Sequence, residues 1–227
     1  MLTLGLDTST AEGSVALGRD GVILGELILS VRATHSETVL PAIDELLTGA
    51  GQCAMDLDAV VVGAGPGSFT GVRIAAALAR GICFPSGIAL LAYSSLAAIA
   101  HEAAGRGQVD QICALLDARR DQVYAAGYGS TEAHDVLFEP KASSIADLLE
   151  SLDPEDWTFA GVVSSPQRAQ LSGAGARFAS DADIHPRAAS LIRLSWKHPE
   201  TGRIPNPAQW EPEYVRSSSA ERRVASD

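Results

Sequence analysis

The chain has 227 residues, of which 46% are hydrophobic, and this is typical of one large or two small globular domains. Its net charge of −11 and isoelectric point near 4.8 argue against autonomous binding to a nucleic-acid backbone. It has no apolar run long enough to span a membrane and no basic signal region at its N-terminus, so we expect a cytoplasmic protein without membrane contact.

The first half of the chain predicts three strands followed by alternating helices and strands. An apolar run at 2–6 ends in Asp7, and strands are expected at 14–18 and 22–30, with a hairpin turn at 18–21 between them. A helix at 36–50, a strand at 59–63 and a helix at 69–82 complete a βββαβα unit. A strand at 88–92 and a helix at 94–104 follow.

The same pattern restarts near residue 112. An apolar run at 112–116 ends in Asp117, and strands at 122–128 and 136–138, a helix at 143–152 and a strand at 157–162 follow. We therefore predict an α/β protein with the actin-like ATPase (ASKHA, ribonuclease-H-like) fold, built from two βββαβα-type halves. The halves are expected at 1–104 and 105–216. The second ends in a proline-rich loop that wraps back, and a disordered tail is expected at 217–227.

The glycine-rich segment between strand 59–63 and helix 69–82 is the most distinctive local motif. It reads Gly63-Ala64-Gly65-Pro66-Gly67-Ser68-Phe69-Thr70-Gly71. A strand-to-helix turn of this kind presents backbone N–H groups that attract anions. It lacks the Lys-Ser/Thr pair of a Walker A loop and the glycine spacing of a dinucleotide fingerprint. Two interpretations stay open, a phosphate site and a tight turn made for close packing.

Aspartates at strand ends are the second candidate for nucleotide chemistry. In the actin-like fold, the aspartate after the first strand lies near metal and phosphate, although the hydroxyl residues after Asp7 can also simply satisfy the turn. The second phosphate loop of that fold normally reads D-x-G, whereas Asp117 is followed here by Ala118 and Arg119. Arg119 and Arg120 are candidates for a phosphate contact or for ordinary salt bridges, and we favour salt bridges. The candidate nucleotide-binding residues are Asp7, Thr8, Gly65, Gly67, Ser68 and Asp117.

Taken together, these motifs resemble the TsaB family, once called YeaZ. The matching segments span residues 2–216 in the family's order, and Gly65 to Arg73 is the most specific of them. They are Asp7-Thr8-Ser9-Thr10, His35-Ser36-Glu37, Gly65 to Arg73, Asp117-Ala118-Arg119-Arg120 with Val123-Tyr124, and Glu211 to Arg216. Little matches between Glu150 and Trp210. The resemblance implies a non-catalytic bacterial subunit that binds and activates TsaD, in the transfer of threonylcarbamoyl to adenosine 37 of tRNAs that read ANN codons.

The resemblance also implies that the surface that docks on TsaD lies on helices 36–50 and 69–82. The expected interface residues are His35, Val39, Ile43, Leu47, Thr70, Arg73 and Ala76. The apolar stripe of helix 36–50 can equally pack on the chain's own sheet. We expect a homodimer through this surface when the protein is free, TsaE in the assembled complex, and only indirect contact with tRNA. No tightly bound cofactor is expected, and ATP or ADP at the interface of the complex is the candidate nucleotide.

Two enzymatic functions are the alternatives. An actin-like small-molecule kinase would use Asp7, the glycine-rich segment and Asp117, and the missing second-loop glycine weighs against it. A peptidase would need a metal pair or an activated nucleophile, and no base is marked for Ser9 or Ser68. We expect no catalytic and no metal-binding residues. The three cysteines are Cys53, Cys83 and Cys113; they form no metal-binding spacing and are expected to be buried as small hydrophobic residues.

Overall fold

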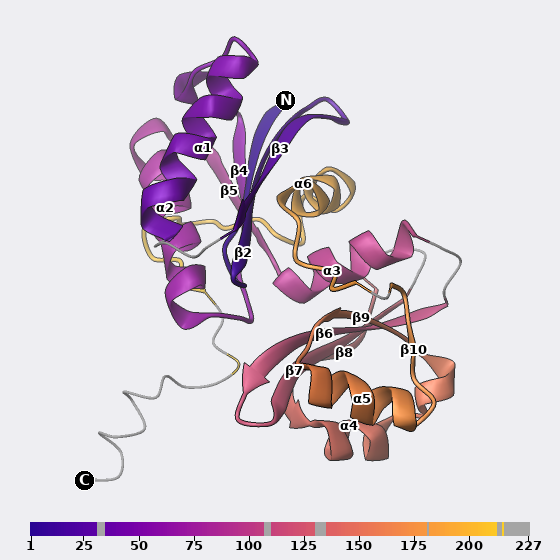
Figure 1. Cartoon of the computed structure of the whole chain (residues 1–227). Coiled ribbons are helices and arrows are strands. Elements are labelled where there is room, and N and C mark those ends of the chain that lie inside the picture. The colour runs from indigo at the N-terminus through magenta and orange to yellow at the C-terminus, as the bar shows by residue number, and fades with distance from the viewer. Residues whose placement is uncertain (31–34, 107–109, 130–134, 181, 213–214, 216–227) are drawn as a thin grey trace, which may run out of the picture.

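Figure 1 shows the computed structural model of the chain. It describes residues 1–30, 35–106, 110–129, 135–180, 182–212 and 215. The tail predicted to be disordered, 217–227, lies outside the described residues.

The first half is built on a five-stranded sheet in the order β3-β2-β1-β4-β5. Its strands are β1 (Leu2–Asp7), β2 (Glu12–Arg19), β3 (Val22–Ser30), β4 (Ala59–Gly63) and β5 (Ala89–Tyr93). The central strand β1 pairs antiparallel with β2 and parallel with β4, so that Leu4 lies beside Leu17 and Val60. Every residue of β1 and β4 is buried. The mainly apolar sequence of both strands fits this burial, because helices cover both faces of the sheet.

Helices α1 (His35–Gly49) and α2 (Phe69–Ser86) cover one face of this sheet, and α6 (Ala188–Lys197) covers the other (Figure 1). The short 3-10 helix η1 (Ala54–Asp56) follows α1. Val39, Ile43 and Leu47 of α1 enter one apolar core with Leu4 and Val60 of the sheet. The stripe on α1 therefore packs on the chain's own sheet, which is the simpler of its two interpretations.

The second half repeats this arrangement, with a sheet in the order β10-β9-β6-β7-β8. Its elements are β6 (Gln111–Arg119), β7 (Gln122–Gly129), β8 (Val136–Ser144), α4 (Ile145–Ser151), η2 (Pro154–Asp156), β9 (Thr158–Val162), α5 (Ser165–Gly173) and β10 (Arg177–Phe178). As in the first half, three antiparallel strands are followed by a helix and then by a strand parallel to the first strand of the unit. This duplicated topology confirms the predicted actin-like fold.

The two halves exchange a helix. α3 (Ser95–Ala104) follows the first sheet but packs against β6 and β7 of the second, whereas α6 follows the second sheet and packs against β1 and β2 of the first. The two helices also contact each other between the sheets (Figure 1). One apolar core joins Val61, Leu96, Ala114 and Leu191 from these layers. Each half therefore contributes a helix to the core of the other.

The segment after α6 runs back along the edge of the first sheet, as the proline-rich composition predicted. The backbone N–H of Ala92 donates to the carbonyl of Gly202 at 2.8 Å, and that of Ile204 donates to the carbonyl of Leu90 at 3.0 Å. The segment thus occupies hydrogen-bonding groups of β5 that an edge strand would leave free. Trp210 completes the attachment by packing against the apolar core beneath α2.

Two of the three cysteines are buried as predicted. Burial raises the pKa of the Cys83 thiol to about 11, and Cys113 lies inside the second sheet. The prediction for Cys53 was wrong, because Cys53 is exposed at the start of η1. Within the described ranges, no helix combines the length and the apolar character needed to cross a membrane.

Candidate functional site

Asp7, the aspartate at the end of β1, is completely buried, and its carboxylate connects two elements. One oxygen accepts hydrogen bonds from the backbone N–H of Ser9 at 2.8 Å and from its hydroxyl at 2.6 Å. The other oxygen accepts the hydroxyl of Ser95 at 2.7 Å. Asp7 therefore ties the end of β1 to the first residue of α3, the helix that crosses to the second half.

The glycine-rich segment lies directly on the backbone that follows Asp7. The N–H of Ser68 donates to the carbonyl of Ser9 at 2.7 Å, and the hydroxyl of Thr8 donates to the carbonyl of Gly71 at 2.6 Å. A Cβ atom at Gly67 would overlap the Ser9 carbonyl oxygen, and one at Gly71 would overlap the Thr8 carbonyl oxygen. These contacts favour the second interpretation of the segment, a turn that uses glycines for close backbone packing.

The structure brings five of the six candidate nucleotide-binding residues into this junction. Gly65 joins it through its carbonyl, which accepts the N–H of Ser95 at 2.7 Å. The hydroxyl of Ser68 caps α2 by accepting the N–H of Gly71 at 3.3 Å. Asp117, the sixth candidate, lies at the end of β6 in the other half. A nucleotide-binding role for these residues stays a prediction.

A small cavity of ≈ 170 Å³ lies beside the junction, between the two halves. Its walls come from the glycine-rich segment, the end of β5, β8 and the C-terminal segment, and include Gly65, Pro66, Tyr93, Ser94, Pro140 and Trp210. The described residues that line it carry no charged side chain. Among the described residues, the cavity therefore offers no counter-charge for the phosphates of a nucleotide.

The turn between β6 and β7 is held in an uncommon backbone conformation. Arg119, Arg120 and Asp121 have φ angles of 61°, 54° and 60°. A two-residue hairpin turn needs positive φ at its central residues, and Asp20-Gly21 meets this need in the turn between β2 and β3. Without a glycine, each left-handed residue costs about 1–2 kcal/mol.

Asp117 anchors this turn to helix α5. Its Oδ1 accepts the backbone N–H of Arg119 at 2.9 Å and the side-chain amide of Gln167 at 3.3 Å. Gln167 is 5% exposed, and its amide also donates to the carbonyl of Gln122 at 3.1 Å. The predicted salt bridges of Arg119 and Arg120 were wrong, because neither guanidinium pairs with an acidic group among the described residues. The side chains of Asp117 and Gln167, and not those of the two arginines, hold the turn.

The residues predicted for the partner interface fall into three groups. Val39, Ile43 and Leu47 of α1 and Ala76 of α2 are at most 5% exposed. Thr70 and Arg73 are exposed on α2, and the guanidinium of Arg73 lies 3.7 Å from the ring centroid of Phe69. The side chain of His35 lies outside the described residues. On the outer side of the same helices the structure shows further exposed residues, namely Leu40, Ala77 and Phe84.

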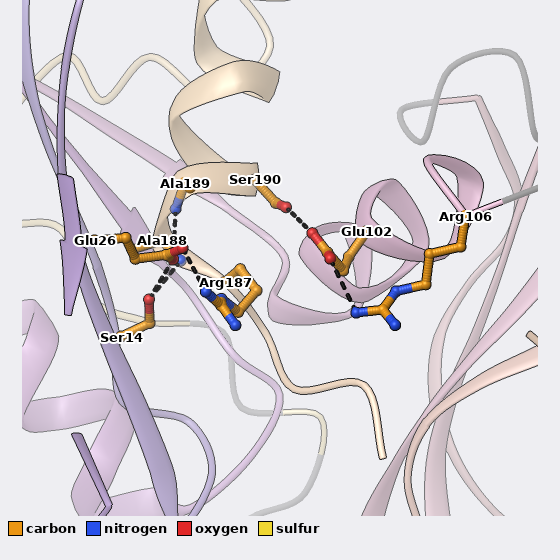
Figure 2. Close-up of polar contacts among 8 residues, drawn as sticks. All are labelled: Ser14, Glu26, Glu102, Arg106, Arg187, Ala188, Ala189 and Ser190. Atoms are coloured by element: carbon orange, nitrogen blue, oxygen red, sulfur yellow. Dashed lines mark hydrogen bonds and ion pairs between the residues drawn. The ribbon is translucent and has the colours of Figure 1, made fainter. Parts of the chain in front are cut away.

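A half-buried acid that the sequence analysis did not single out holds the start of α6 (Figure 2). The carboxylate of Glu26 on β3 accepts hydrogen bonds from the guanidinium of Arg187 at 2.6 Å, the hydroxyl of Ser14 at 2.6 Å and the N–H of Ala189 at 3.1 Å. The Ser14 hydroxyl in turn accepts the N–H of Ala188 at 3.0 Å. Two strands thus cap α6, whose own first residues supply no side-chain cap. A glutamate within the apolar run 22–30 was the available signal.

Burial and hydrogen bonding act in opposite directions on this acid. Burial acts to raise the pKa of the Glu26 carboxyl, but the hydrogen bonds from Arg187, Ser14 and the Ala189 backbone outweigh it and lower the pKa below its ordinary value of 4.5. Glu26 is therefore charged at neutral pH, opposite both Arg187 and the positive end of the α6 dipole.

Known proteins show similarity to this chain over most of its length. A family model described as TsaD, tRNA N6-adenosine threonylcarbamoyltransferase, matches residues 23–192. The Bacillus subtilis protein named tRNA threonylcarbamoyladenosine biosynthesis protein TsaB is 32% identical over 97% of this chain and 96% of its own. The chain belongs to the TsaB family. The predicted resemblance is therefore confirmed.

One further relative matches over a shorter region, and a solved structure matches over almost the whole chain. The Haemophilus influenzae TsaB is 41% identical over 53% of this chain, and the match spans about half of that protein, 51%. A solved Pseudomonas aeruginosa structure, described as similar to peptidase YeaZ, is 30% identical and covers 95% of this chain and 99% of its own, with a TM-score of 0.80. Both halves of the chain, including the glycine-rich segment and helices α1 and α2, thus have a counterpart in this solved structure.

Proposed function

We propose that this chain is a non-catalytic partner subunit of the bacterial complex that transfers threonylcarbamoyl to adenosine 37 of ANN-reading tRNAs, where it binds and activates TsaD. Membership of a family whose curated relatives are named for threonylcarbamoyladenosine biosynthesis carries the pathway assignment. We infer the non-catalytic role from the buried Asp7 carboxylate, because its oxygens already accept three hydrogen bonds from neighbouring groups. TsaE and tRNA would join the same complex, with tRNA held by another subunit.

The same geometry weighs against a kinase or a peptidase. A kinase would need the Asp7 carboxylate to face a metal or phosphate, whereas this carboxylate is completely buried and its oxygens accept hydrogen bonds from Ser9 and Ser95. A serine peptidase would need an activated hydroxyl, but the Ser9 hydroxyl donates to Asp7 and the Ser68 hydroxyl caps α2. Both serines therefore have structural partners, and ATP or ADP is better sought where this subunit meets TsaD.

The outer sides of α1 and α2 are the docking surface that we propose for TsaD, and for a second copy of the chain when TsaD is absent. Leu40 is 56% exposed and Phe84 is 70% exposed, although both are large and apolar. Ala77 lies between them in sequence on the outer side of α2 and allows a close approach to another helix. Such apolar side chains are typical of the centre of a protein interface.

Charged substitutions on this surface should abolish docking without unfolding the protein. Ala77→Glu and Phe84→Glu would place a carboxylate in an apolar contact, and burying one large apolar side chain contributes about 1.5–3 kcal/mol. We expect each variant to keep its melting temperature and to bind TsaD at least tenfold more weakly in isothermal titration calorimetry. Both residues are exposed, whereas Ile43 and Ala76 are buried and glutamate there would damage the core.

Leu137→Glu is the matched control, because Leu137 is an exposed apolar residue, at 45%, on β8 in the other half. It should bind TsaD like the unmodified chain. Wild-type affinity in both α2 variants would show that the docking surface lies elsewhere, and a wild-type chain that does not bind TsaD would contradict the proposed function.

A further inference from the structure

His101 is the histidine of α3, the helix that leaves the first half and packs against both the second sheet and α6 (Figure 1). Its side chain is half-buried, and its Nδ1 atom is buried without a hydrogen-bond partner among the described residues. A neutral imidazole carries a proton on only one nitrogen, whereas the imidazolium carries an N–H on both. Protonation would therefore bury a donor that nothing accepts, and this costs free energy.

The charges of α6 oppose a positive ring as well. Lys197 and Arg193 are one turn apart on α6, and both act electrostatically on His101. Like charges near a partly buried group repel more strongly than they do in water. Lysine and arginine stay charged throughout the pH range in which histidine titrates, so this repulsion does not fade as the pH falls.

One acid acts in the other direction, but it is engaged elsewhere. Glu102, next to His101 on α3, favours a positive ring. Its Oε1 accepts the guanidinium of Arg106 at 3.2 Å, and its Oε2 accepts the hydroxyl of Ser190 at 3.3 Å (Figure 2). The charge of Glu102 is thus shared with Arg106, and it is the smallest of the influences on His101.

The apolar core beneath α3 has tyrosine as its ionisable residue type, at Tyr93, Tyr124 and Tyr128. A phenol titrates only near pH ~10, so these residues add no charge in the range where histidine titrates. The protonation state of His101 is therefore decided by burial, by its unpartnered nitrogen and by the two cations of α6.

From these observations we propose that His101 is a pH-sensitive switch at the contact between the two halves, in which protonation of the ring loosens the packing of α3 on α6. Burial, followed by Lys197 and Arg193, lowers the pKa of His101 below its ordinary value of 6.5. The folded chain thus favours the neutral ring. The stability that depends on this neutral ring is complete above pH 6.5 and is lost as the pH falls below that value. The loss falls on one contact, because α3 and α6 each join both halves.

The first test compares the parent chain with His101→Gln and His101→Leu, neither of which can take up a proton. The unfolded chain binds this proton near pH 6.5 and the folded chain resists it. The folded-to-unfolded ratio of the parent should therefore fall by up to about tenfold per pH unit below 6.5, relative to each variant. Urea unfolding near pH 7.5, 6.5 and 5.5 measures this ratio. Glutamine keeps a polar group and leucine does not, so both variants should lose this pH dependence whatever their stability near pH 7.5. The same pH dependence in the parent and in both variants would overturn the proposal.

Two further measurements assign the effect to this contact. In an NMR titration of the histidine rings, the signal absent from His101→Gln identifies His101, and its midpoint should lie below 6.5. Lys197→Gln should raise that midpoint, whereas the control Lys141→Gln, on β8, should leave it unchanged. In hydrogen exchange corrected for the intrinsic effect of pH, the amides of α3 and α6 should open more below pH 6.5, and those of α1 should not. A midpoint at or above 6.5, or opening that is uniform along the chain, would contradict the role of His101.

Discussion

Gly71→Ala should destabilise the protein by about 3 kcal/mol or more, because the added methyl group would overlap a backbone oxygen that cannot move independently. The Thr8 carbonyl concerned belongs to the segment between Asp7 and Ser9, whose backbone is held by the hydrogen bonds of the junction. In a chain of this size the melting temperature should fall by roughly 6–12 °C. Differential scanning calorimetry of the purified variant measures the effect.

Gly81→Ala is the matched control in the same helix. A Cβ atom at Gly81 meets no atom within 4 Å, and alanine in a helix interior is about 0.5–1 kcal/mol more stable than glycine. The two substitutions should therefore shift the melting temperature in opposite directions. Equal and small shifts would show that the glycine-rich segment does not pack on residues 8–9 as described.

Glu26→Gln should cost about 2 kcal/mol of unfolding free energy at pH 7, since it removes the charge that holds Arg187 and the first N–H groups of α6. Glu102→Gln is the control on α3. It removes the ion pair with Arg106, whose side chain is 47% exposed while that of Glu102 is 29% exposed, and it keeps an oxygen that can accept the hydroxyl of Ser190 on α6 (Figure 2). Such exposed pairs contribute about 0–1 kcal/mol. Urea unfolding of both variants and of the parent measures the difference.

The effect of Glu26 should also depend on pH, in a direction fixed by its lowered pKa. A carboxyl whose pKa is lower in the folded state stabilises the protein above its unfolded pKa, and this contribution is lost as the pH falls through the folded value. The difference between parent and Glu26→Gln should thus be complete near pH 7 and shrink below pH 4.5. A difference that is constant from pH 7 to pH 3 would show that the charge of Glu26 does not hold α6.

Periodicity and turn chemistry were enough to predict most of the fold. The strands at 2–6, 22–30 and 59–63 match β1, β3 and β4 within one residue, because each is a mainly apolar segment bounded by turn residues. The prediction missed α5, β10 and α6, which lie where the resemblance was weakest. The apolar face of α6 can be interpreted only once its packing partner is known, because α6 covers the sheet of the first half.

The candidate site was predictable in part. The sequence identified Asp7 and the glycine-rich segment but left open whether the glycines make room for a phosphate or for another segment of backbone. The answer depends on distances of about 3 Å between segments some 60 residues apart. The helices of the docking surface were predicted, but most of the chosen residues were buried. A helical stripe shows which residues share a face and does not show which face meets the sheet.

Reconstitution of tRNA modification tests the central claim most directly. Purified chain, TsaD, TsaE, tRNA, ATP and threonylcarbamoyl-adenylate would be combined, and the modified adenosine measured with each protein omitted in turn. The proposed role predicts modified adenosine only when TsaD is present, and a yield that falls sharply when this chain is left out. Undiminished modification by TsaD without this chain, or modification by this chain without TsaD, would contradict it.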